Sequence, residues 1–164
     1  MITENQVQIT KDLQNKRVII TRHFNAPVEE VWNAWTDSSL LDQWWAPKPY
    51  KAETKEMNFT EGGYWLYAMV GPDSSKTWCK VEFTRIDPNK SFEAADSFCD
   101  EQGNKSSGSP SMHWKNRFHA AANGTEVIVE ISFATEDDLK KIMEMGFEVG
   151  FTAGLGNLEK LLEK

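Results

Sequence analysis

The sequence lacks any cluster of basic residues, and its charge balance is acidic. Its 164 residues include 18 Lys and Arg against 25 Asp and Glu, which gives a formal net charge of -7. Binding to nucleic acid or to an anionic membrane surface requires a basic patch. The composition therefore argues against both kinds of partner.

Long apolar runs are missing as well. No stretch approaches the ~20 residues that span a membrane, and residues 1–15 are too polar for a signal peptide. We therefore expect a cytoplasmic protein. The two cysteines, Cys79 and Cys99, have no metal-ligand spacing, and we expect reduced thiols in that compartment.

Motifs of catalysis and of cofactor binding are also absent. The three histidines do not have the spacing of a helical metal site, and nucleophile-elbow, phosphate-loop and dinucleotide patterns are not found. We predict no catalytic set, no metal and no cofactor, and we expect His113 and His119 on the outer face of their strand. Four residues on expected central strands remain as acid–base candidates, most of them expected on the solvated face: Tyr67, Glu82, Arg85 and Asp96.

What the sequence does contain is aromatic residues, 12% of the total with seven Trp. The length suits one domain with a proper core. We assign residues 16–164 to this domain and residues 1–15 to an N-terminal extension, in which residues 7–13 form a possible short strand. Trp side chains often line ligand sites, but we expect most of these seven to belong to the packed core.

The first half of the expected domain begins with a strand and two helices. Residues 16–24 are rich in β-branched side chains and predict a strand. Asn25 is a candidate cap for a helix with Pro27 in its first turn. The helical spacing of Val31, Trp32 and Trp35 predicts a buried face. A second short helix over residues 39–44 follows Asp37 or Ser38 as cap.

Residues 50–133 carry the turn signals of antiparallel hairpins. Turns are expected at residues 61–63, 71–73, 87–89 and 123–124, with a polar loop over residues 100–110. A two-residue turn at Asn123-Gly124 pairs Phe118 with Val129 and Trp114 with Phe133. The inward residues of the last strand are then Val127, Val129, Ile131 and Phe133. The inward stripe of the earlier strands is Met57, Phe59, Trp65, Tyr67, Met69, Val81 and Phe83.

The register of the hairpin around Asn89 stays open. Without a bulge Cys79 faces Cys99, at a Cα separation of ~4.5–5.5 Å, but Glu82 then faces Asp96, a like-charge pair. A slip of one residue puts Cys79 beside Phe98 and relieves the repulsion.

After Thr135, a candidate cap, the apolar period changes to that of a helix. Its apolar positions predict one long C-terminal helix, and its four glycines indicate close packing against the sheet or room for something else. The order of strand, two short helices, about six strands and a long helix is an α+β fold.

The sequence resembles the activator of heat-shock protein 90 ATPase homologue-like family, within the START/birch-pollen-allergen-like (SRPBCC) superfamily. The matching residues are the opening motif Arg22-x-Phe24-x-Ala26-Pro27-x-x-x-Val31-Trp32-x-Ala34-Trp35-Thr36-Asp37, then Trp44-Trp45-Ala46-Pro47, Gly62-Gly63, Met69-x-Gly71-Pro72, Pro88, Gly124-Thr125 and Met145-Gly146-Phe147-x-x-Gly150-Phe151. The resemblance implies a helix-grip fold, a curved antiparallel sheet wrapped round the C-terminal helix with a hydrophobic cavity between them. It implies no shared catalytic residues.

Three functions follow as hypotheses. The first is binding of a small apolar or aromatic molecule in the cavity, the second a cyclase/aromatase-type enzyme on a polyketide-like substrate, and the third a stress-related co-chaperone acting through its surface. The mouth of the cavity is expected near Trp44, Trp45 and Pro47, with the loop over residues 100–110 nearby. The expected cavity residues are Trp45, Met57, Trp65, Tyr67, Val81, Phe83, Met112, Trp114, Phe118, Phe147 and Phe151.

Overall fold

The structure, a computed structural model, describes residues 7–108 and 110–163. Residues 1–6 of the expected N-terminal extension, Ser109 of the expected loop and Lys164 lie outside the described residues. The elements in chain order are β1 (Gln8–Asp12), β2 (Arg17–Phe24), α1 (Val28–Thr36), α2 (Ser38–Trp44), β3 (Lys51–Met57), β4 (Tyr64–Val70), β5 (Lys76–Asp87), β6 (Ser91–Cys99), β7 (Ser111–Ala121), β8 (Gly124–Phe133), α3 (Glu136–Glu144) and α4 (Phe147–Leu162).

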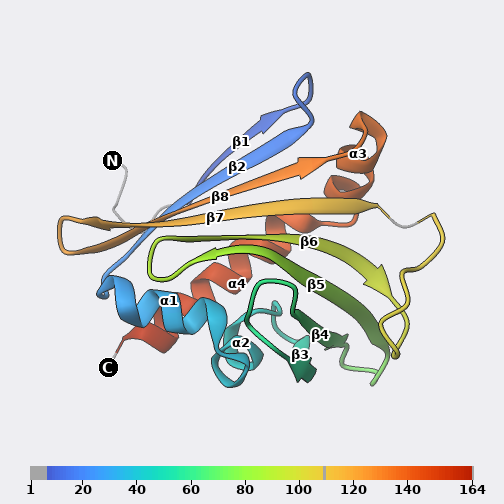
Figure 1. Ribbon diagram of the computed structural model, residues 1–164, viewed down its shortest axis with the longest axis horizontal. Coiled ribbons are helices and arrows are strands. Elements are labelled where there is room, and N and C mark those ends of the chain that lie inside the picture. The colour runs from blue at the N-terminus through green and yellow to red at the C-terminus, as the bar shows by residue number, and fades with distance from the viewer. Residues whose placement is uncertain (1–6, 109, 164) are drawn as a thin grey trace.

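All the strands belong to one antiparallel sheet in the order β1-β2-β8-β7-β6-β5-β4-β3. Figure 1 shows the curved sheet with α4 running along one face and with α1 and α2 near the C-terminal end of α4. α3 lies beside the start of β7 and the end of β8. This arrangement confirms the expected α+β helix-grip fold. The sheet has one strand more than the expected set of one strand followed by six, because β1 pairs with β2.

The register of β7 and β8 differs from the sequence-based expectation by two residues. Phe118 pairs with Val127 rather than Val129, and Trp114 pairs with Ile131 rather than Phe133. The turn therefore consists of Ala122 and Asn123.

Gly124 explains this register. A Cβ at Gly124 would lie 2.0 Å from the carbonyl oxygen of Phe24, so this glycine permits a close approach of β2 instead of forming the turn. A shift of two residues preserves the side of the sheet that each residue faces. The expected inward residues Val127, Val129, Ile131 and Phe133 are accordingly buried.

A β-bulge decides between the two registers considered for β5 and β6. Next to the turn, Asp87 pairs with Ser91 as expected without a bulge, but the register shifts between Phe83 and Arg85. Beyond the shift Cys79 pairs with Phe98, so the two cysteines do not face each other, and both are free thiols.

The connection from β3 to β4 is longer than the expected three-residue turn. β3 ends at Met57, and Phe59 lies in the loop, where its ring packs 4.8 Å from the ring of Phe83. Phe59 therefore still faces the core, although it does so from a loop rather than from a strand. A second bulge, between Thr54 and Glu56, changes the register within β3.

The C-terminal helical region is two helices instead of one long helix. Gly146 adopts a φ of 87° between α3 and α4, a left-handed conformation that ends helices at low cost for glycine. Thr135 caps α3 as expected, since its side chain accepts a hydrogen bond from the backbone N–H of Asp138 at 3.0 Å.

The caps of the first two helices differ from each other. The residue at the N-cap of α1 is Pro27 instead of Asn25, and α1 has no side-chain cap hydrogen bond. Asp37 caps α2 as expected and accepts a hydrogen bond from the backbone N–H of Ser39. Among the described residues, none of the helices is both long enough and apolar enough to cross a membrane.

Candidate functional site

An open cavity of about 370 Å³ lies between the sheet and the junction of α3 and α4. Its walls come from β4 to β7, from the segment that follows α2 and from the two C-terminal helices. The lining is mainly aromatic and aliphatic, with a few polar groups: Trp45, Pro47, Tyr50, Tyr67, Met69, Thr77, Cys79, Asp96, Ser97, Phe98, Met112, Trp114, Ile142, Met145, Gly146, Phe147, Gly150 and Phe151. Apolar walls with few polar groups are typical of small-molecule sites.

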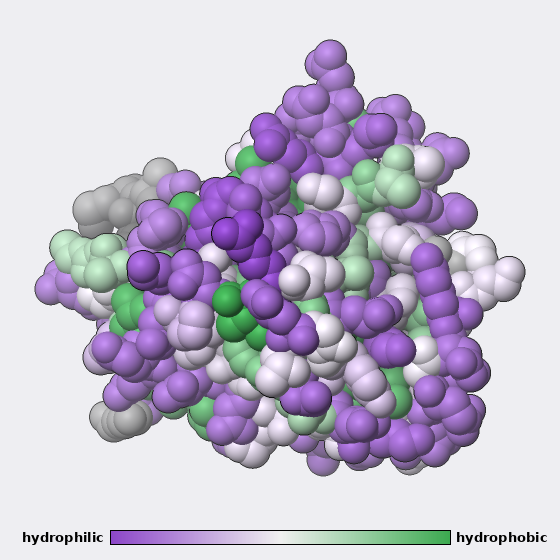
Figure 2. Space-filling view, in the orientation of Figure 1, coloured by the Kyte–Doolittle hydropathy of each residue, from purple (hydrophilic) through white to green (hydrophobic). Residues whose placement is uncertain are grey.

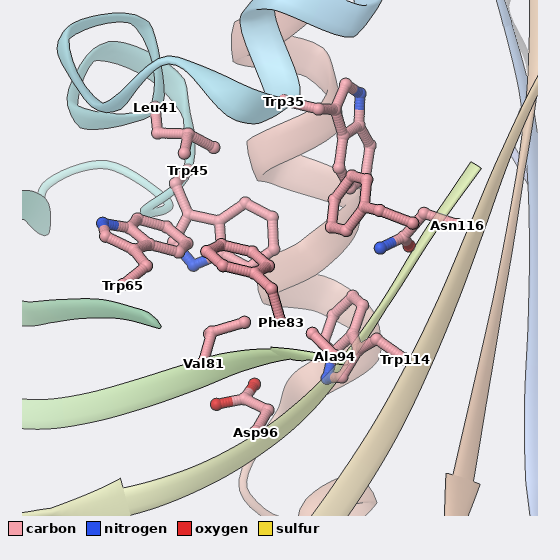
Figure 3. Close-up of a pocket in the computed structure, with 11 residues that line it drawn as sticks. Trp35, Leu41, Trp45, Trp65, Val81, Phe83, Ala94, Asp96, Trp114 and Asn116 are labelled. Atoms are coloured by element: carbon pink, nitrogen blue, oxygen red, sulfur yellow. The ribbon is translucent and has the colours of Figure 1, made fainter. Parts of the chain in front are cut away.

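A second, much smaller pocket of about 30 Å³ lies deeper in the core. Figure 3 shows the rings of Trp35, Trp45, Trp65, Phe83 and Trp114 around it. The residues that line both cavities are Trp45, Asp96 and Trp114. These three side chains therefore stand at the boundary between the two spaces.

Trp45 is held in the wall by hydrogen bonds and ring contacts. Its indole N–H donates to the hydroxyl of Tyr67 at 2.9 Å. The ring of Tyr67 stacks on that of Trp65 with centroids 4.0 Å apart, and the indole N–H of Trp65 donates to the hydroxyl of Thr54 at 2.9 Å. The aromatic wall is thus fixed in place.

The segment after α2 is pressed against α4 at a glycine. A Cβ at Gly154 would lie 3.0 Å from the carbonyl oxygen of Trp45 and 3.4 Å from that of Trp44. The side-chain amide of Asn157 donates to the carbonyl oxygen of Ala46 at 3.1 Å. Close packing therefore explains Gly154, whereas Gly150 lines the cavity, where its missing side chain leaves room.

Three titratable groups lie together in the wall. Burial raises the pKa of Asp96 to about 7, against the lowering effects of the indole N–H of Trp114 and the backbone N–H of Ser97. Burial, followed by the nearby Cys79 and Asp96, raises the pKa of Tyr67 well above its ordinary value. Burial, followed by Asp96, raises the pKa of the Cys79 thiol. Tyr67 and Cys79 are therefore neutral at physiological pH, and Asp96 is the group that titrates there.

Most of the residues expected in the cavity line one or both of the two spaces: Trp45, Trp65, Tyr67, Val81, Phe83, Met112, Trp114, Phe147 and Phe151. Among the described residues, the linings include neither Met57 nor Phe118. Met57 packs against the edge of the core at the end of β3. Phe118 is buried against Trp32, with ring centroids 5.2 Å apart. The part that these residues play in ligand binding stays a prediction.

The four acid–base candidates divide into two pairs. Tyr67 and Asp96 are buried and line the cavity, whereas Glu82 and Arg85 are exposed. His113 and His119 are exposed, as expected. In the part of the chain that the structure describes, no group of three or more His, Cys, Asp or Glu side chains is arranged to hold a metal ion.

Several lining residues were missed from the sequence. The end of α3 and the break before α4 contribute Ile142, Met145 and Gly146 to the lining. The apolar pattern of the sequence predicts one long helix and therefore does not predict this break. Tyr50 lies in the segment after α2, beside the expected mouth at Trp45 and Pro47. Trp44 is fully buried, and its indole N–H donates to the carbonyl oxygen of Ala34. None of the described residues of the loop over 100–110 lines the cavity.

Comparison with known proteins identifies the family. Residues 25–163 match the family described as Activator of Hsp90 ATPase homolog 1-like protein. The chain belongs to this family. No match among curated proteins was found.

Solved structures of bacterial proteins support this membership. The chain is 28% identical to protein Ms6760 from Mycobacterium smegmatis, with a TM-score of 0.88 and coverage of 94% of this chain and 95% of the other. It is 30% identical to a protein from Arthrobacter aurescens, with a TM-score of 0.89 and coverage of 94% and 90%. It is 31% identical to a protein from Staphylococcus epidermidis, with a TM-score of 0.82 and coverage of 94% and 92%.

Proposed function

We propose that this member of the family is a cytoplasmic protein that binds a small apolar or aromatic molecule in the cavity between the sheet and α4. The observation that carries the proposal is the open space of about 370 Å³ with aromatic walls. Protein interiors normally pack with few voids larger than a water molecule. A space of this size beside a fixed aromatic wall suits the ring system of a small ligand.

The polar content of the cavity favours binding over catalysis. Among the described residues that line the two spaces, Asp96 is the only one with an ionisable carboxyl or a basic group. A cyclase/aromatase-type enzyme would place a hydrogen-bonded acid and base on its substrate. The hydroxyl of Tyr67 accepts a hydrogen bond from the indole N–H of Trp45. Burial raises the pKa of Tyr67, so its phenol stays protonated and is not available to take a proton from a substrate.

The surface gives less support to a co-chaperone. The described large apolar side chains with high exposure are Leu13, Tyr50, Met145 and Val149. On the face drawn in Figure 2 the coloured surface is mostly hydrophilic, with small separate apolar areas. Broad apolar patches are the usual mark of a protein-binding surface. Tyr50 and Met145 moreover belong to the cavity lining.

Two measurements test the proposal. Native mass spectrometry of the purified protein detects a co-purified ligand as an added mass. Titration with N-phenylnaphthylamine, an apolar fluorescent probe, detects an empty cavity through enhanced emission. We expect one of these signals, and the absence of both would contradict the proposal.

A pair of glycine variants locates the binding. A Cβ at Gly150 would be 3.6 Å from the Pro47 ring, which is ordinary contact, so Gly150→Leu is expected to fold and to fill the cavity. A Cβ at Gly156 meets open space, which makes Gly156→Leu the matched control on the same helix. We expect Gly150→Leu to abolish probe binding and Gly156→Leu to preserve it. Equal binding by both variants would place the probe elsewhere.

A further inference from the structure

The carboxylate of Asp96 lies in an aromatic environment, where the N–H groups near it, from Trp114 and Ser97, carry no charge. The residue is 7% exposed, lies in the middle of β6 and lines both cavities. Its neighbours across the sheet are Val81 on β5 and Met112 on β7. Among the described residues no Lys, Arg or His forms an ion pair with it. A buried charge without a partner is costly, so it is normally paired, hydrogen-bonded or neutralised.

Two indole rings line both cavities, as this carboxylate does. Trp45 and Trp114 line both spaces, with ring centroids 5.8 Å apart. Trp is the side chain that attracts a cation most strongly through its ring face. A group lodged at this boundary therefore meets one negative charge and two indole rings.

The indole N–H of Trp114 is a second buried polar group at the same place. Trp114 is 5% exposed, and its Nε1 has no hydrogen-bond acceptor of normal geometry among the described residues. In Figure 3 this nitrogen is on the side of the ring toward Asp96, and its N–H favours the ionised carboxyl. Buried polar groups are rarely left unsatisfied. Trp114 thus helps to keep a negative charge that the protein itself does not neutralise.

We propose that the natural ligand carries a protonated amine on its apolar body, and that Asp96 binds this amine between Trp45 and Trp114. The inference rests on the proposed function and specifies its ligand class. The apolar body occupies the outer cavity of about 370 Å³. The inner pocket of about 30 Å³ exceeds the ~10–15 Å³ that one water molecule needs, so it can accept a group of the size of an ammonium but no further ring.

Three matched probes test this inference by calorimetric titration: naphthylmethylamine, its neutral analogue naphthylmethanol, and methylnaphthalene. Charged hydrogen bonds in a buried site change affinity by roughly ten- to a hundredfold. We expect the wild-type protein to bind the amine more tightly than the alcohol by a factor in this range. Asp96→Asn, which preserves shape, is expected to abolish that preference while still binding the alcohol.

Glu82→Gln serves as the control variant, because Glu82 is exposed on the neighbouring strand, and it should retain the preference for the amine. Equal affinity of wild type for amine and alcohol, or an undiminished preference in Asp96→Asn, would overturn the inference and leave the proposed function standing. Failure of all three probes to bind would overturn the inference, and together with the absence of a co-purified ligand and of N-phenylnaphthylamine binding it would also contradict the proposed function.

The pH dependence of ligand binding by the wild-type protein tests the inference independently if Asp96→Asn does not fold. The titratable groups that interact electrostatically with Asp96 are Tyr67 from β4, Cys79 from β5 and Cys99 from its own strand, and the raised pKa of each keeps it neutral. We expect affinity for the amine to fall severalfold from pH 8 to about pH 5.5, as Asp96 gains its proton, and affinity for the alcohol to stay constant. A parallel change for both probes would count against the inference.

Discussion

The face of the sheet that points to the core carries similar aromatic side chains at both ends. At one end other side chains pack closely against them, whereas at the other end they border a cavity. At one end α1 places Trp32 against Phe92, Phe118 and the loop residue Phe59, with ring centroids 5.2–5.8 Å apart. At the other end Tyr67 and Phe151 face a cavity of about 370 Å³. We call the first the closed end and the second the open end.

The covering helices account for the difference. The buried face of α1 supplies Trp32 and Trp35 to the closed end. At the open end the helical cover is interrupted at Gly146, and Gly150 presents no side chain to the space. Whether an aromatic strand residue belongs to the core or to the cavity wall therefore depends on whether a helix packs against it. Aromatic content alone does not distinguish the two.

Truncating one phenylalanine at each end should give the largest contrast. Phe118→Ala at the closed end creates a cavity in packed surroundings and should lower the free energy of unfolding by about 3–5 kcal/mol. Phe147→Ala at the open end removes a half-buried wall residue and should cost only about 1 kcal/mol. Urea unfolding of both variants measures the difference, and equal losses would abolish the distinction between the ends.

Asp96 should make the open end sensitive to pH. Its pKa is raised to about 7 in the folded protein from an ordinary 3.8, so the folded state holds the proton more tightly than the unfolded state. Stability is then lost as pH rises from about 4 to about 7, by no more than about 4 kcal/mol.

The difference between wild type and Asp96→Asn isolates this effect from the carboxyls whose pKa is lowered, such as Asp12 and Asp100. Asp96→Asn should gain stability relative to wild type as pH rises through this window, in denaturant unfolding at each pH. A difference that is independent of pH would show that the carboxyl is not buried in solution.

Two glycines on α4 give the smallest effects, of opposite sign. Gly154→Ala forces a Cβ to within 3.0 Å of the Trp45 carbonyl oxygen and should destabilise the protein by about 1–3 kcal/mol. Gly156→Ala meets open space and should stabilise it by up to about 1 kcal/mol, from helix propensity. Thermal unfolding distinguishes them. Stabilisation by both changes would mean that α4 does not press on the segment after α2.

The sequence by itself determined the features that depend on neighbours along the chain. The alternation in β8 predicted that Val127, Val129, Ile131 and Phe133 face inward, and they do. The sequence indicates Thr135 as one cap and narrows the other to Asp37 or Ser38, of which Asp37 is the cap, because a cap bonds to backbone within three residues. The inward side of Trp65, Tyr67 and Phe83 followed from the same local periodicity.

Only the tertiary structure decided features that depend on contacts between distant segments. The carbonyl of Phe24 explains Gly124 and the β7–β8 register, and a bulge between Phe83 and Arg85 separates the cysteines. For the site, periodicity placed Phe118 on the inward side of its strand and Phe147 on the inward side of its helix. It did not show that α1 covers Phe118 whereas Phe147 lines a cavity. It also did not single out Asp96 from Glu82, because burial of a carboxyl depends on the exact strand pairing, and one bulge reverses the side on which a residue lies.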